Sequence, residues 1–248
     1  MKKLNFIRTG ITMPLLFVCC FFANAQSPIS FTQAMDSILA PLDKAPISTG
    51  ILYERVKPMA NIDLFNLTFS DPFIAEYSYF GQAYFELYNA AYNKTNWIRP
   101  EHLRAYAEGE SLQGKFTVGV LDYQFNVIDS NAVSNGQLSF NNGQFHNVPG
   151  AASPYWLKRI QVASILADEI PSGQFSLYYN SDFVKTNQAL SISNIQLNFG
   201  IIGIYTLSPA NPVAQLTFSG SGVKRYTITI LYTNGTSFSH EAEVQNWH

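Results

Sequence analysis

The sequence predicts an α+β protein in which N-terminal helices precede, or pack on, an antiparallel β-sandwich. Up to about Gly109, apolar residues recur every three to four positions, and beyond Gly114 they alternate with polar residues. Further along, short apolar runs are separated by Gly, Asn and Pro, which is typical of strands joined by tight turns. We therefore expect a helical region over residues 26–112 and a β-sandwich region over residues 113–248.

The first 25 residues have the pattern of a cleavable secretory signal peptide. Lys2, Lys3 and Arg8 form its positive start, residues 11–22 form an apolar core, and residues 23–25 (Ala-Asn-Ala) suit a signal peptidase. The apolar run is shorter than the roughly 20 residues that span a bilayer. We expect cleavage after residue 25, a secreted or cell-surface protein, and no integral membrane span after cleavage.

Cysteine and charge content exclude several classes of function. Both cysteines, Cys19 and Cys20, lie in the signal segment, so the mature chain has no thiol for disulfides, catalysis or metal binding. Without the three basic residues of the signal segment, the 15 Lys and Arg become 12, against 17 Asp and Glu. This acidic balance excludes nucleic acid as an expected partner. Charged residues make up only 13% of the chain and aromatic residues 15%, which suits contact with carbohydrate or with other proteins.

Three helices are expected in the first region. Ser30 and Gln33 form a capping box at the start of an amphipathic helix over residues 30–39. Residues 70–72 (Ser-Asp-Pro) are a strong helix start, and residues 99–101 (Arg-Pro-Glu) begin a brief third helix that ends near Gly109. Between the first two helices, residues 47–56 are expected to form a strand or an extended segment.

The second helix carries a stripe of aromatic and aliphatic residues. Its members are Phe73, Tyr77, Phe80, Tyr84, Leu87 and Ala91, with Phe85, Tyr88 and Tyr92 beside them. Aromatic residues at helical spacing are usually a face packed on a sheet, and that interpretation is favoured here. The alternative is a platform on which sugar rings stack. Under that alternative the candidate ligand-binding residues are Tyr77, Tyr84, Tyr88, Tyr92 and Trp97.

The second region is expected to consist of strands. Residues 121–127 alternate between apolar and polar, and residues 138–148 form a hairpin around Asn141-Asn142-Gly143. Further strands are expected at residues 156–166, 174–179, 190–199, 202–207 and 213–218.

A C-terminal hairpin is the best specified element of the chain. One apolar face is expected to consist of Tyr226, Ile228, Ile230, Tyr232, Phe238, His240, Ala242 and Val244. The connecting pair Asn234-Gly235 is the pair best able to adopt two positive φ angles. Because an isolated hairpin is only marginally stable, it must belong to a larger sheet.

A pattern in about the last 50–55 residues resembles a known family. It consists of residues 195–200 (Ile-Gln-Leu-Asn-Phe-Gly), followed by Phe218, Gly222, Tyr226, Ile228, Ile230, Gly235, Ser239 and Val244. This pattern is similar to a PKD-type immunoglobulin-like module, although Ile201-Ile202 replaces that family's Asp-Gly. The resemblance implies a PKD-like sandwich over residues 190–248 that acts as a non-catalytic extracellular spacer or binding module. The order of segments also resembles the N-terminal region of large proteins exported by type IX secretion systems, some of which continue into an α/β-hydrolase domain.

The sequence contains no complete catalytic or metal-binding set. Residues 109–116 follow a P-loop pattern until Phe116, which replaces the Ser or Thr that holds Mg²⁺. His240 begins a zinc-protease pattern, but Val244 occupies the place of the second histidine. Adjacent carboxylates such as Asp168 and Glu169 say nothing about the separation that glycoside cleavage requires. We therefore assign no catalytic residue, no metal ligand and no cofactor.

These observations predict a secreted, non-catalytic protein for binding, adhesion or scaffolding. Its expected partner is a polysaccharide or a cell-surface protein. The alternative is a secreted hydrolase of glycosidase or esterase type, or the accessory N-terminal region of one. Two carboxylates that converge in an aromatic cleft would favour this alternative.

Overall fold

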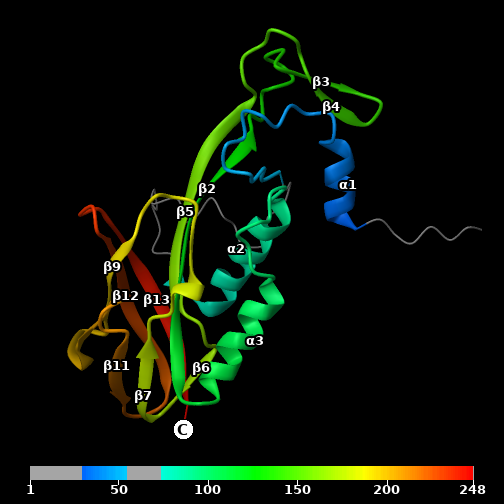
Figure 1. The fold of residues 1–248 in the computed structure, drawn as a ribbon. Coiled ribbons are helices and arrows are strands. Elements are labelled where there is room, and N and C mark those ends of the chain that lie inside the picture. The colour runs from blue at the N-terminus through cyan, green and yellow to red at the C-terminus, as the bar shows by residue number, and fades with distance from the viewer. Residues whose placement is uncertain (1–29, 55–73, 248) are drawn as a thin grey trace, which may run out of the picture.

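The structure is a computed structural model, and it describes residues 30–54 and 74–247. Within these residues the chain forms three α-helices, two large β-sheets and a small two-stranded hairpin (Figure 1). The predicted signal peptide and the predicted helix start at residues 70–72 lie outside the described residues. The fold is mostly β and compatible with a β-sandwich.

The helices agree with the sequence prediction except at one boundary. Helix α1 (Phe31–Ile38) has the predicted capping box: the Ser30 hydroxyl accepts the Gln33 N–H at 3.2 Å, and the Gln33 side chain accepts the Ser30 N–H at 3.0 Å. Helix α3 (Pro100–Ser111) begins with proline as predicted and runs slightly beyond Gly109. Helix α2 (Tyr77–Ala90) starts later than its stripe suggested, because strand β1 (Ile74–Ala75) pairs with the C-terminal strand instead of continuing the helix.

The segment over residues 47–56, expected to be a strand or an extended segment, forms no regular strand in the part that the structure describes. Residues 48–50 form a turn and a bend, and Ile51 and Leu52 make single bridges, to Ala91 and Asn126 respectively. Gly50 has a φ of 67°, which breaks an extended conformation at this point. The segment therefore ties the end of α2 to the central sheet without joining that sheet as a strand.

The two large sheets are mixed, whereas the sequence analysis predicted antiparallel ones. The outer sheet has the order β1, β13 (Ser237–Trp247), β12 (Gly222–Tyr232), β9 (Ile192–Asn198) and β10 (Ile204–Leu207), with β6 (Glu169–Pro171) also on β13. The central sheet has the order β11 (Val213–Phe218), β7 (Gly173–Tyr178), β2 (Lys115–Ile128) and β5 (Tyr155–Ile165), with β8 (Val184–Thr186) also on β2. The parallel pairs are β1 and β6 with β13, and β7 and β8 with β2. The small hairpin is β3 (Leu138–Asn141) with β4 (Gln144–Asn147).

Each strand predicted beyond residue 113 is present, and most of the ends differ by at most two residues. Strand β2 begins at Lys115, six residues before the predicted alternation, and the short strands β6 and β8 were not predicted. The C-terminal hairpin also presents its predicted apolar face to the interior. Its turn differs from the prediction: Gly235 has a φ of 86°, but Asn234 does not adopt a positive φ. Instead, the Asn234 side chain accepts the Thr236 N–H at 3.0 Å, and the Tyr232 carbonyl accepts the Gly235 N–H at 3.0 Å. The two positive φ angles occur in the other predicted turn, at Asn142 and Gly143.

The central sheet lies between the helices and the outer sheet (Figure 1). On the helical side, a side chain at Gly119 of β2 would collide with Phe80 of α2 and with Leu166. On the other side, the Tyr226 hydroxyl of β12 accepts the Ile165 N–H of the edge strand β5 at 3.0 Å. Strand β2 is therefore buried on both faces over most of its length, although alternation alone predicts one exposed face.

Candidate functional site

Three of the five predicted ligand-binding residues meet in one aromatic cluster. The Trp97 ring lies 5.0 Å from Tyr84 and 6.2 Å from Tyr88 on α2, and it stacks on Tyr123 of β2 at 4.6 Å. Tyr84 is only 2% exposed, and its hydroxyl donates to the Ile98 carbonyl at 2.7 Å. Through these contacts the connection between α2 and α3 packs on the central sheet, in line with the prediction that the aromatic stripe is a packed face.

The other two candidates lie apart from this cluster and from each other. Tyr92 follows the C-terminal end of α2, and its hydroxyl donates to the Ile47 carbonyl at 2.6 Å. Tyr77 is the first residue of α2 and lines a cavity of about 560 Å³. Of the five, Tyr77 and Tyr84 border this cavity, and Tyr77 is the one with substantial exposure there.

The cavity lies between α2 and α3 and has a volume of about 560 Å³. We call it the α2–α3 groove. Its floor is apolar and is formed by Phe80, Ala107 and Leu166, each of which is buried. Its walls include Tyr77, Gly81, Phe85, Glu101, Arg104 and Asp168.

Gly81 lines the α2–α3 groove beside open space. A Cβ atom added to Gly81 would meet no heavy atom within 4 Å. Gly81 lies inside α2, where glycine costs about 1 kcal/mol relative to alanine. A methyl group at position 81 would therefore lie in open space.

The charges around Tyr77 come from two segments, α3 and the loop after β5. Arg104 and Glu108 of α3 form an ion pair at 2.7 Å, and Asp168 lies in the loop after β5. Burial raises the pKa of the Tyr77 hydroxyl; Arg104 opposes this effect, and Glu108 and Asp168 add to it. Tyr77 is therefore a neutral hydroxyl at physiological pH, able to donate and to accept a hydrogen bond.

Carboxylates also border the groove. Glu86 is 1% exposed, and one of its oxygens accepts the Tyr53 hydroxyl at 2.5 Å. Glu101 lies in the first turn of α3, and Asp168 is exposed beside Tyr77. Glu101 and Asp168 are thus the carboxylates that lie on the accessible wall of the groove.

A second cavity, of about 500 Å³, lies between α1 and the C-terminal end of α2. Its lining includes Lys44, Glu54, Tyr92 and Lys94. Burial raises the pKa of Glu54 to about 7, against the opposing effects of the Ile128 N–H, which the carboxylate accepts, and of Lys158. This cavity combines both signs of charge and has fewer aromatic residues than the α2–α3 groove.

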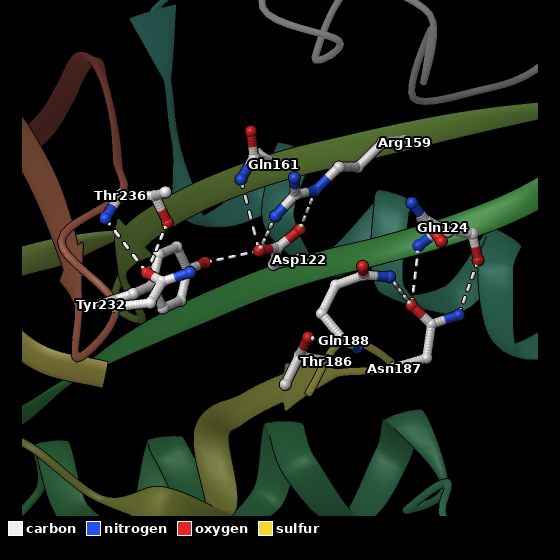
Figure 2. A network of polar contacts seen from close by, with 10 residues as sticks. Asp122, Gln124, Arg159, Gln161, Thr186, Asn187, Gln188, Tyr232 and Thr236 are labelled. Atoms are coloured by element: carbon white, nitrogen blue, oxygen red, sulfur yellow. Dashed lines mark hydrogen bonds and ion pairs between the residues drawn. The ribbon is translucent and has the colours of Figure 1, made fainter. Parts of the chain in front are cut away.

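A polar network inside the sandwich could not have been predicted from the sequence (Figure 2). Asp122 of β2 is 1% exposed and accepts two bonds of 2.7 Å from Arg159 of β5. It also accepts the Tyr232 hydroxyl at 2.5 Å and the Gln161 amide at 3.3 Å. The hydrogen bond to Asp122 raises the pKa of Arg159. The pKa of Tyr232 is also raised, mainly by burial and then by the hydrogen bond to Asp122. The network joins strands β2, β5 and β12.

His240, which begins the incomplete zinc-protease pattern, makes hydrogen bonds to the backbone. His240 accepts the Ala163 N–H at 2.9 Å through Nε2, and Nδ1 lies 3.0 Å from the Glu241 carbonyl. Among residues 30–54 and 74–247, no group of three or more His, Cys, Asp and Glu side chains is placed to hold a metal ion. No helix in that part of the chain is long and apolar enough to cross a membrane.

No protein-family model matches the chain, and no curated protein matches it either. The structure adds one fact about the region of residues 190–248 that resembles a PKD-type module. Its strands β9, β10, β12 and β13 belong to the outer sheet, whereas β11 pairs with β7 in the central sheet. Most of the facing layer therefore comes from residues outside this region.

Proposed function

We propose that the protein is a secreted, non-catalytic binding protein that holds a segment of polysaccharide in the α2–α3 groove. The observation that carries the proposal is the composition of the groove: the aromatic rings of Tyr77 and Phe85 stand beside Glu101, Arg104 and Asp168 over an apolar floor. A pyranose ring has an apolar face that packs on aromatic rings, and its hydroxyls bond to carboxylates and guanidinium groups.

Features outside the groove support an exported role in adhesion or scaffolding. The first 25 residues have the signal-peptide pattern, and charged residues make up only 13% of the chain. The C-terminal pattern resembles PKD-type modules, which implies an extracellular spacer or binding unit. An exported protein that anchors a cell or an enzyme to a polysaccharide fits all three features.

The test is glycan binding with a matched pair of variants. The purified protein is applied to an array of immobilised polysaccharides, and the dissociation constant for a soluble oligosaccharide of the positive class is measured by calorimetry. Gly81→Leu projects a side chain into the groove, whereas Gly109→Leu changes a helical glycine that has equally free space but lies outside the groove lining. We expect the dissociation constant to rise at least about tenfold for Gly81→Leu and to stay unchanged for Gly109→Leu. Absence of binding to the whole array, or equal binding by Gly81→Leu, contradicts the proposal.

The hydrolase alternative is favoured by one observation, namely that Glu101 and Asp168 lie beside aromatic rings in the same groove. The oligosaccharide from the array is incubated with the protein, and released reducing ends are measured. Release that is lost in both Glu101→Gln and Asp168→Asn would establish a glycosidase in place of a binding protein. Unchanged oligosaccharide after prolonged incubation excludes this alternative for that ligand.

A further inference from the structure

The open edges of the two large sheets lie next to each other at β10 and β11. In the described part of the chain, β10 pairs only with β9, and β11 pairs only with β7. The two strands follow each other in sequence and are in contact. One side of the molecule therefore presents the hydrogen-bonding edge of both layers.

The outward backbone groups of β10 can be identified from its register. The Phe199 N–H donates to the Gly203 carbonyl at 3.0 Å, and the next pairs are Tyr205 with Leu197 and Leu207 with Ile195. Because hydrogen-bonded pairs alternate in an antiparallel ladder, Tyr205 and Leu207 turn their N–H and C=O groups towards β9. Ile204 and Thr206 turn theirs away from β9, towards the open edge.

This edge lacks the charged side chains with which proteins often block edge-to-edge pairing. Residues 186–223 include no Asp, Glu, Lys, Arg or His, although both edge strands lie in this range. Exposed aliphatic side chains gather here instead: Ile201 is fully exposed, Ile204 is 64% exposed and Val213 is 47% exposed. Natural edge strands commonly carry lysine or inward-pointing charges that prevent pairing, so an uncharged aliphatic edge is suited to receive a strand.

We propose that β10 pairs in antiparallel orientation with β10 of a second copy of this chain. Antiparallel pairing of identical strands is a twofold contact in which each surface faces itself. A twofold axis beside Tyr205 places Ile204 opposite Thr206 of the second copy, so that two residue pairs exchange their outward N–H and C=O groups. The two outer sheets then become one continuous sheet.

The uncharged edge is also where two copies of this chain can approach each other. The mature chain has five more acidic than basic residues, because 12 Lys and Arg remain against 17 Asp and Glu. Two copies therefore repel each other over most orientations, and an uncharged stretch of 38 residues is where they approach at the lowest electrostatic cost. Because β10 is short, we expect a modest dimer with a dissociation constant of about 1–100 μM.

Sedimentation velocity on the exported, purified full chain tests this pairing over about 1–200 μM. Ile204→Lys places a charge on the edge, and Thr206→Pro removes an outward N–H, a change that edge strands tolerate. We expect each variant to raise the dimer dissociation constant at least about tenfold, with unchanged circular dichroism. The matched control Val223→Lys adds the same charge at a 53% exposed position of β12, inside the same sheet, and should leave the dimer intact.

Each other outcome overturns the proposal. A wild-type chain that stays monomeric over this range excludes self-pairing. A dimer that persists in both Ile204→Lys and Thr206→Pro places the contact elsewhere. A wild-type monomer whose sedimentation changes only when an extended peptide of unrelated sequence is added assigns the edge to a foreign strand.

Discussion

His240 of β13 accepts the backbone N–H of Ala163 in β5 at 2.9 Å, and this bond joins the outer sheet to the edge of the central sheet. The same ring lies with Nδ1 3.0 Å from the Glu241 carbonyl, so the neutral imidazole with its proton on Nδ1 satisfies both contacts. A protonated ring has no acceptor for the Ala163 N–H. Glu241 is the charged group that acts on this ring.

The first prediction is a loss of stability in mild acid. Burial lowers the pKa of His240 from its ordinary 6.5, against the opposing effect of Glu241. The folded protein therefore binds this proton less readily than the unfolded chain, so the contribution is complete above about pH 6.5 and is lost as the pH falls towards the lower folded-state pKa. Each pH unit in that window costs up to about 1.4 kcal/mol. The free energy of unfolding is measured in urea from pH 7.5 down to pH 5, in steps of about half a pH unit. The wild type and the control His102→Gln, at an exposed position, should both lose stability over this range. His240→Gln should not show this loss. An identical slope in His240→Gln would refute the assignment.

The second prediction concerns Glu54 and has the opposite sign. Burial raises its pKa to about 7 from an ordinary 4.5, so the folded state favours the protonated carboxyl. Its contribution to stability is complete below about pH 4.5 and is lost as the pH rises through about 7. Glu54→Gln keeps an oxygen that can accept the Ile128 N–H and removes the titration. We expect this variant to be more stable than the wild type by about 1–2 kcal/mol at pH 8 in urea unfolding. The exposed Glu169→Gln should change little, and a gain of the same size there would show that the effect is not specific to Glu54.

The third prediction compares a buried with an exposed ion pair. Asp122→Asn leaves Arg159 and Tyr232 without their shared carboxylate inside the sandwich, which should cost about 2–4 kcal/mol of unfolding free energy. The surface pair Arg225–Glu243 has a single contact at 3.1 Å, and the Arg225 side chain is 68% exposed. Glu243→Gln should therefore cost less than about 1 kcal/mol. Equal losses in the two variants would mean that the buried network contributes no more than a surface contact.

The fourth prediction uses two glycines with opposite surroundings. A Cβ atom at Gly119 would lie 2.6 Å from Leu166 and 2.8 Å from Phe80, so Gly119→Ala should destabilise the protein by about 1–3 kcal/mol. Gly81→Ala adds a methyl group that meets nothing within 4 Å and raises helix propensity, so it should stabilise the protein by up to about 1 kcal/mol. Both values come from denaturant unfolding. A stabilised Gly119→Ala would mean that α2 can move away from the central sheet.

The candidate site shows how far sequence reasoning reaches. Tyr77 could be named in advance because it belongs to an aromatic stripe at helical spacing. Glu101, Arg104 and Asp168 could not, because they come from other segments and meet Tyr77 only when α3 and the loop after β5 pack against α2. Tyr84, Tyr88 and Trp97 were named as a set and do lie together, but as a packed cluster with Tyr123.

The sequence by itself determined the local elements of this protein. The capping box of α1, the proline start of α3 and the alternating faces of β12 and β13 depend on residues within a few positions of one another, so composition and spacing were sufficient. Only the tertiary structure decided how these elements combine. In β2, Tyr123 and Phe125 face the helical layer, against Trp97 and Tyr53, while Asp122 faces the outer sheet and bonds to Tyr232. The pattern shows that side chains alternate, but it does not say which layer covers each face, because that depends on contacts between residues about a hundred positions apart.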